Sequence, residues 1–396
     1  MFNIKALAFV AGAFFVSANI AFAQTVTNAD GVRTVIYKTG AKAKGQWSLS
    51  PKPLLQISGD DKVEILDIAG VVRQSNGTVV VASHKTTDLR FFSPDGKHVR
   101  TVGRQGNGPG EFDRLFHLFR IRDTLVGADR ADVLQLFTPD GKYIRTEQRA
   151  KAGPLGEFVD RSGFLNDGSS ILRMSPARDT TGPVKKMMNF TVLRSDAGTV
   201  TPVGRFPFYE RVSMRSDPLA SAKFGAVGSI AILSNGFCVG YSDMMALSCY
   251  DRNGKQLSRV ERSGVLGRVV TDADKHAYID AVTKANPGPQ AVASLKSIRE
   301  NTVYAERMPA FGRIVGTLSD EVWVAPVLRE DESYSLNAVP ENATVWSVFS
   351  SNGDWLSDIT LPQRFRLMEA GARYVAGVLK DADDVETVVV YSIAKR

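Results

Sequence analysis

A glycine-rich run from Gly103 to Gly110 is the first stretch of the sequence whose residue types could do chemistry. Such runs bind phosphate when backbone N–H groups approach the anion and a lysine followed by serine or threonine completes the motif. Glu111 and Phe112 stand where those residues are needed, and a carboxylate repels phosphate. We therefore interpret the run as a structural connector, in which glycine supplies positive φ angles and Pro109 stiffens the turn.

Candidate metal ligands are scattered along the chain. The histidines lack the paired spacing of a zinc site, and neither a Gly-x-Ser-x-Gly elbow nor a cysteine–histidine pairing marks a nucleophile. Acidic and amide residues near expected strand starts could converge on a central channel, but turn capping or solvent exposure is the favoured explanation. The histidines are His84, His98, His117 and His276, and the acidic and amide residues are Asp67, Asp160 and Asn166. The sequence predicts no catalytic residue and no cofactor, and it leaves open a divalent metal in a channel.

The two cysteines fall in one expected β-hairpin. If Tyr241 faces Ala246 across the turn, Cys238 lies directly opposite Cys249, at a separation that suits a disulfide. An oxidising compartment agrees with this pairing. We predict a Cys238–Cys249 disulfide; two reduced, buried thiols in a different register are the alternative.

Two segments rich in basic and aromatic residues, 175–189 and 205–225, are candidate binding loops. Loops on a rigid scaffold often carry binding function. Solvated excursions without a ligand are the alternative. The candidate binding residues are Arg178, Lys185, Arg205, Phe208, Arg211 and Arg215.

A repeat shows which elements must position these residues. Residues 92–101 return almost unchanged as residues 137–146, and each copy contains the Pro-Asp-Gly turn of a β-hairpin. Weaker turns of this kind recur downstream, and a second Asn-Gly or Asp-Gly turn precedes most of them. Each repeat is therefore a meander of about four strands. The additional turns are at 75–77, 166–168, 196–198, 234–236, 252–254 and 351–353.

Repeats of this length, made of four short strands, are typical of β-propeller blades. The sequence predicts an all-β, six-bladed β-propeller, whereas an open two-sheet fold would leave the repeat unexplained. The expected blades lie near residues 67–103, 114–149, 158–204, 226–262, 310–362 and 365–393.

The last expected blade has only three strands before the chain ends. Residues 53–59 correspond in pattern to the outer strand at 98–103. We therefore expect the N-terminal segment to supply the outer strand of the last blade, which closes the ring and removes an exposed edge.

One segment, residues 271–302 between blades four and five, breaks the β pattern. Thr271 offers an N-cap, and Tyr278 and Val282 recur at helical spacing. A Pro-Gly-Pro turn at 287–289 separates this helix from a second one. We expect a two-helix hairpin that packs on the propeller and covers part of the channel mouth; a brace on the rim is the alternative.

The run at 103–112, followed by Leu-Val-Gly-Ala-Asp at 125–129 and by 133–141, resembles the NHL repeat and the exported bacterial six-bladed propellers related to it. This resemblance is specific in the first two blades. It implies a propeller used as a binding platform. A minority of such proteins carry out hydrolytic or lyase chemistry at the channel.

The N-terminus indicates export. A charged start, an apolar stretch and the small residues Ala21 and Ala23 form a signal peptide over residues 1–23, with cleavage after Ala23. A membrane anchor is the alternative, but polar residues shorten the apolar stretch. The expected mature chain, residues 24–396, is a soluble, monomeric protein of the periplasm or the cell exterior.

The charge balance limits the classes of partner that the chain is expected to bind. The chain carries 49 basic and 42 acidic residues, and removing residues 1–23 lowers the formal charge from +7 to +6. No run of lysine and arginine is dense enough for nucleic acid. The sequence favours a non-catalytic binding or scaffolding module of the cell envelope, with an unknown ligand or protein partner. A channel-centred, metal-dependent hydrolase of the lactonase or esterase type is the alternative.

Overall fold

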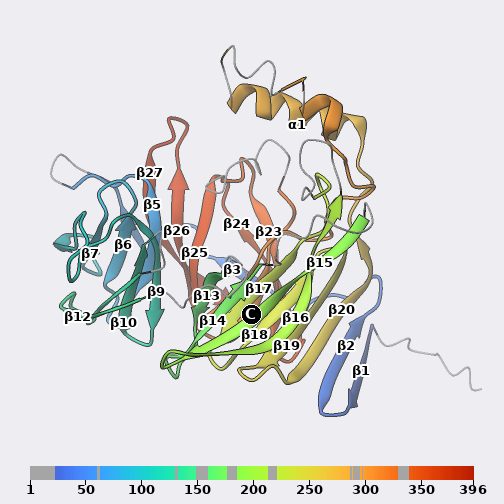
Figure 1. Cartoon of the computed structure of the whole chain (residues 1–396), viewed down its shortest axis with the longest axis horizontal. Coiled ribbons are helices and arrows are strands. Elements are labelled where there is room, and N and C mark those ends of the chain that lie inside the picture. The colour runs from blue at the N-terminus through green and yellow to red at the C-terminus, as the bar shows by residue number, and fades with distance from the viewer. Residues whose placement is uncertain are drawn as a thin grey trace, which may run out of the picture.

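The structure is a computed structural model of the whole chain, and it describes most of the residues beyond the N-terminus (Figure 1). Of the described residues nearly all regular structure is β, with one long helix. The described residues are 23–59, 63–129, 133–148, 159–175, 185–212, 221–285, 288, 295–296, 298–328 and 339–396. The expected signal peptide lies outside them, except for Ala23.

Six antiparallel sheets form the blades of a β-propeller, as the sequence predicts. The first strands of neighbouring blades contact one another around the ring. Blade one comprises β5 (Ile68–Arg73), β6 (Val79–Ser83), β7 (Asp88–Phe92) and β8 (His98–Val102). Blade two comprises β9 (Leu115–Ile121), β10 (Thr124–Asp129), β11 (Leu134–Phe137) and β12 (Tyr143–Glu147). Blade three comprises β13 (Val159–Phe164), β14 (Ser170–Met174), β15 (Lys185–Asp196) and β16 (Thr199–Val212).

The other three blades follow in sequence order. Blade four comprises β17 (Gly228–Leu233), β18 (Gly236–Tyr241), β19 (Met244–Asp251) and β20 (Gln256–Leu266). Blade five comprises β21 (Ile314–Gly316), β22 (Glu321–Val324), β23 (Thr344–Ser350) and β24 (Trp355–Leu361). Blade six comprises β25 (Phe365–Gly371), β26 (Tyr374–Lys380) and β27 (Glu386–Lys395), completed by β3 (Trp47–Leu49) and β4 (Leu55–Ile57).

The hydrophobic core lies between the blades. Every residue of β6 and β7 is buried, because the middle strands of a blade are covered on both faces. One core cluster combines Val80 and Phe91 of blade one with Leu115 and Phe137 of blade two. A single blade therefore cannot bury its faces, and each depends on its neighbours.

The N-terminal segment closes the ring. Strand β4 pairs antiparallel with β27, with Ile57 opposite Val388 and Leu55 opposite Val390. The side chains of Leu55 and Ile57 are buried in a cluster shared by blades six and one, which includes Val81. The sequence-based expectation of a closing outer strand is confirmed.

A further N-terminal hairpin was not predicted from the sequence. Strands β1 (Gln24–Ala29) and β2 (Val32–Tyr37) extend blade four, where β2 runs parallel to β20. Arg33 of β2 pairs with Asp354 of blade five (2.9 Å). The segment after β2 then follows blade five toward blade six, and its Lys44 N–H donates to the Trp355 carbonyl (3.0 Å). Residues 23–59, here called the N-terminal strap, thus run along the outer edges of blades four, five and six.

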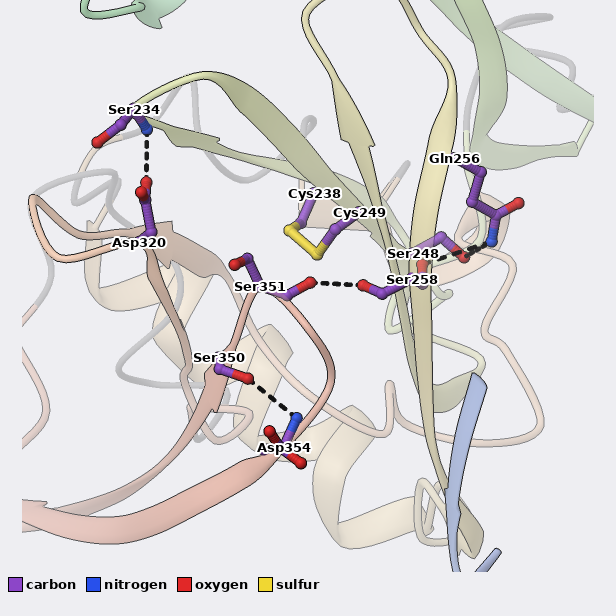
Figure 2. The surroundings of a disulfide bond; sticks show 10 residues. All are labelled: Ser234, Cys238, Ser248, Cys249, Gln256, Ser258, Asp320, Ser350, Ser351 and Asp354. Atoms are coloured by element: carbon purple, nitrogen blue, oxygen red, sulfur yellow. Dashed lines mark hydrogen bonds between the residues drawn. A yellow bond between two sulfur atoms is a disulfide. The ribbon is translucent and has the colours of Figure 1, made fainter. Parts of the chain in front are cut away.

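The two cysteines form a disulfide in blade four (Figure 2). Cys238 of β18 lies directly opposite Cys249 of β19, in the register predicted from the sequence, and both are buried. Beside the disulfide, the Ser258 hydroxyl donates to the Ser351 carbonyl (2.5 Å) and so links blade four to blade five. The disulfide therefore strengthens the blade on which the N-terminal strap begins.

The segment between blades four and five carries helix α1 (Asp272–Ala285), which lies beyond one end of the strands (Figure 1). Thr271 caps it, accepting a hydrogen bond from the Asp274 N–H (3.3 Å), and Val282 is buried. Of the second predicted helix, only residues 295–296 and 298–302 are described, and 295–296 and 298–301 are helical. Within the described residues, no helix is long and apolar enough to cross a membrane.

Replacement of Ile57 by alanine should destabilise the whole propeller by about 2 to 4 kcal/mol, because it leaves a cavity at the ring closure. Urea unfolding of the purified chain measures this change. The neighbouring Gln56 is exposed on the same strand, so Gln56→Ala should change stability by less than about 0.5 kcal/mol. Equal effects of the two substitutions would contradict the closing role of β4.

Loss of the disulfide should lower stability by about 3 kcal/mol, since it closes a short loop of the unfolded chain. The midpoint of urea unfolding should fall when dithiothreitol is added to the wild type, but not when it is added to a double Cys238→Ala, Cys249→Ala variant. Thiol titration of the denatured wild type should find no free thiol. Two titratable thiols would refute the pairing.

Candidate ligand-binding cavity

A cavity of about 470 Å³ opens between blades four, five and six. Its lining residues come from the starts of the first strands, the ends of the second strands and the start of β23. In an antiparallel meander these positions share one edge, so the cavity lies on the face where the connectors between blades enter. This volume lies within the range of small-molecule sites, on the order of 300–1,000 Å³.

Apolar and aromatic side chains make up most of the wall. Phe311, Trp346, Phe365 and Met308 are each at least nine-tenths buried in the fold and border the cavity. At its rim the apolar side chain of Val227 is 44% exposed. An apolar body of a ligand would therefore replace water against these surfaces.

Three of the neutral polar lining residues, Ser242, Thr344 and Trp346, form hydrogen bonds within the protein. The Ser242 hydroxyl accepts a hydrogen bond from the Val227 N–H (2.9 Å), and the Trp346 indole N–H donates to Thr344 Oγ1 (3.1 Å). These bonds hold the start of β17 and the ring of Trp346 in place. They position the wall before any ligand enters.

The charged lining residues that the structure describes are all basic: Lys223, Arg313 and Arg366. Arg366 donates to the Ile68 carbonyl (3.0 Å) and pairs with Glu386 (3.4 Å), so its charge is balanced by blade six. Burial lowers the pKa of Arg366, and the carboxylate of Glu386 opposes that effect.

Arg313 immediately precedes β21. Its Nη2 donates to the Leu367 carbonyl (2.9 Å), and its guanidinium carbon lies 5.5 Å from the centre of the Trp346 ring. Many protein atoms lie near the Arg313 side chain. The side chain is nevertheless exposed, because solvent reaches it through the cavity. Burial, and then the nearby positive charge of Arg366, lowers the pKa of Arg313.

Two neighbouring elements support the wall from behind. The end of β16 forms bridges from Tyr209 to Val227 and from Arg211 to Ser221. Tyr278 of α1 packs edge-on against Phe224, with ring centres 6.0 Å apart. No described residue of α1 lines this cavity, and Tyr278 supports its wall from behind; a cover over the channel mouth stays a prediction.

The structure corrects the loop interpretation of the candidate binding residues. Lys185 begins β15, and Arg205, Phe208 and Arg211 lie in β16, because residues 185–189 pair with 207–212 to lengthen blade three. Phe208 packs on Phe190 (5.7 Å) and Arg211 is buried, while Arg205 is exposed. None of the four lines the cavity described above. Binding by these residues stays a prediction, and Arg178 and Arg215 lie outside the described residues.

The candidate metal ligands do not come together. Asp160 pairs with Arg173 across blade three (2.9 Å), the Asp67 carbonyl accepts a hydrogen bond from the His84 N–H (2.8 Å), and the Asn166 N–H donates to the Ser234 carbonyl. Within the described residues no group of three or more histidine, cysteine, aspartate or glutamate side chains is placed to hold a metal. The described part of the chain thus gives the hydrolase alternative no assembled ligand set.

The glycine-rich run is built as a connector. Gly103 has a φ of 80°, and a Cβ there would lie 2.9 Å from the Phe112 ring. Glu111 accepts hydrogen bonds from the Gly108 N–H (2.9 Å) and Arg104 (2.7 Å), which lowers the pKa of its carboxyl. The carboxylate fills the space that a phosphate would need.

Sequence reasoning did not find the cavity. Two of its basic residues follow a buried phenylalanine: Arg313 stands two residues after Phe311, just before β21, and Arg366 directly follows Phe365, the first residue of β25. A phenylalanine shortly before an arginine, Phe311 and Phe365, is the sequence pattern that could have indicated the cavity. This pattern indicates a shared site only when the starts of the first strands are known to lie on one face of the propeller.

Comparison with known proteins supports the architecture. Residues 53–125 match the family model DUF5128, described as a 6-bladed beta-propeller. A DUF4221 family member from Bacteroides vulgatus is 13% identical, with 89% of this chain and 99% of that chain covered and a TM-score of 0.54. A Bacteroides fragilis protein thought to be exported is 12% identical, with 92% and 99% covered and a TM-score of 0.46. No curated protein matches. The chain is a six-bladed β-propeller.

Proposed function

We propose that the chain is an exported, non-catalytic binding propeller that holds a small, largely apolar molecule in the cavity between blades four, five and six. The observation that carries this proposal is the cavity itself, with its size and its wall of Phe311, Trp346 and Phe365. Apolar pockets with a few fixed polar groups are the usual form of small-molecule sites.

The architecture supports a binding role. The ring of blades provides a rigid platform, and the N-terminal strap ties blade four to blades five and six, which form the cavity. Among the described residues no metal-ligating group accompanies the cavity. A platform that retains a ligand without converting it agrees with these features.

Export rests on the N-terminal sequence, and the Cys238–Cys249 disulfide is consistent with an oxidising compartment. Strand β1 begins at Gln24, directly after the expected cleavage point. The mature protein should therefore begin at Gln24. Edman sequencing of the protein from the periplasm or culture medium tests this, and an N-terminus at Met1 would contradict cleavage.

The neutral dye N-phenyl-1-naphthylamine tests the cavity. Its fluorescence should rise with saturable, one-to-one binding to the wild type. Ser229→Phe places a bulky ring in the cavity from β17, and it should weaken binding by about tenfold or more.

Val345→Phe is the matched control. Val345 is exposed and lies on β23 between two lining residues, Thr344 and Trp346, so its side chain points to the opposite face. This variant should bind the dye like the wild type. Equal binding by Ser229→Phe, at an unchanged melting temperature, would refute the cavity as the site.

A further inference from the structure

The described charged residues of the cavity wall all carry positive charge. The described lining residues include three cations, Lys223, Arg313 and Arg366, and no aspartate or glutamate. Taking a cation out of water costs free energy unless an opposite charge or hydrogen bonds replace the lost hydration.

Three largely buried arginines among the described residues have a carboxylate partner. Arg366 pairs with Glu386 (3.4 Å), Arg120 with Glu369 (3.3 Å) and Arg90 with Asp88 (2.9 Å). These pairs show how this chain balances a guanidinium in its interior. Arg313 differs from them: it is exposed at the cavity wall and has no such carboxylate partner among the described residues.

Arg313 has no carboxylate of the described residues within ion-pair distance. Its side chain donates a hydrogen bond to the Leu367 carbonyl and lies over the face of the Trp346 ring. A guanidinium has several N–H donors in a planar fork, so donors remain for a ligand. The Trp346 ring and the carbonyl hold the fork in a fixed orientation at the cavity wall.

The surroundings of Arg313 favour an anion. Arg366, in the same wall, adds positive charge near Arg313, but Glu386 balances it, so Arg313 is the arginine that an anion entering the cavity would pair with. Low-polarity walls such as those of Phe311 and Phe365 strengthen this attraction relative to water.

We propose that the natural ligand is an amphipathic carboxylate, whose acid group pairs with the guanidinium of Arg313 and whose apolar body lies against Phe311, Trp346 and Phe365. This inference rests on the proposed function and names its ligand class. The planar fork of arginine matches the two oxygens of a carboxylate, which a neutral alcohol cannot reproduce.

Displacement of bound N-phenyl-1-naphthylamine compares two probes of equal chain length, decanoate and 1-decanol. The wild type should bind decanoate about tenfold or more tightly than 1-decanol, as a charge-assisted pair predicts. Arg313→Gln should abolish this preference while dye and 1-decanol still bind. Arg145→Gln, an exposed arginine of blade two, should leave the preference unchanged.

A second variant keeps the test decisive if Arg313→Gln does not fold. Arg313→Lys retains the charge but loses the fork, so the preference for decanoate should fall without disappearing. A full preference in every folded variant at this position would overturn the assignment to Arg313.

Two further outcomes separate this inference from the proposed function. Equal affinity of the wild type for decanoate and 1-decanol, with intact dye binding, would overturn the carboxylate inference and leave the apolar site standing. Absence of saturable dye binding and of decanoate binding to the wild type would overturn both.

Discussion

Closure of the ring is the constraint on which the rest of the structure depends. Blade faces are apolar, and each is buried only by the next blade, so an open ring would expose both ends of the stack. Strand β4 prevents this by pairing with β27, and the N–H of Ile68, where blade one begins, donates to Glu386 of blade six (2.9 Å). Because the cavity lies between blades four, five and six, its shape is fixed only in the closed ring.

Buried charged residues also link neighbouring blades of the closed ring. Around the junction of blades six, one and two, Glu369 accepts hydrogen bonds from the Arg73 N–H (2.8 Å) and the Tyr374 hydroxyl (2.9 Å) and pairs with Arg120. Burial raises the pKa of the Glu369 carboxyl, and Arg120 opposes that shift. A network with its partners in place fixes three blades relative to one another. At the cavity, by contrast, Arg313 meets an aromatic ring and a carbonyl, and this difference separates a structural cation from one available to a ligand.

The fold was predictable because its signals are local. The Pro-Asp-Gly turns at 94–96 and 139–141 and the continuous apolar strand β6 specify blades directly, and the cysteine register followed from one hairpin. The β1–β2 hairpin was not predictable, since its parallel pairing with β20 joins segments more than two hundred residues apart. The cavity escaped prediction for a different reason: Arg313, Trp346 and Phe365 become neighbours only when blade five folds and packs against blade six. Blade three was misjudged where residues of mixed polarity, 205–212, continue a strand.

The most direct test of the account is a crystal structure of the mature chain with decanoate. The account predicts electron density for the ligand between blades four, five and six, with the carboxylate oxygens within hydrogen-bond distance of the Arg313 guanidinium and the alkyl chain along Phe311 and Trp346. An empty cavity at a saturating concentration, or a carboxylate that faces solvent away from Arg313, would contradict it.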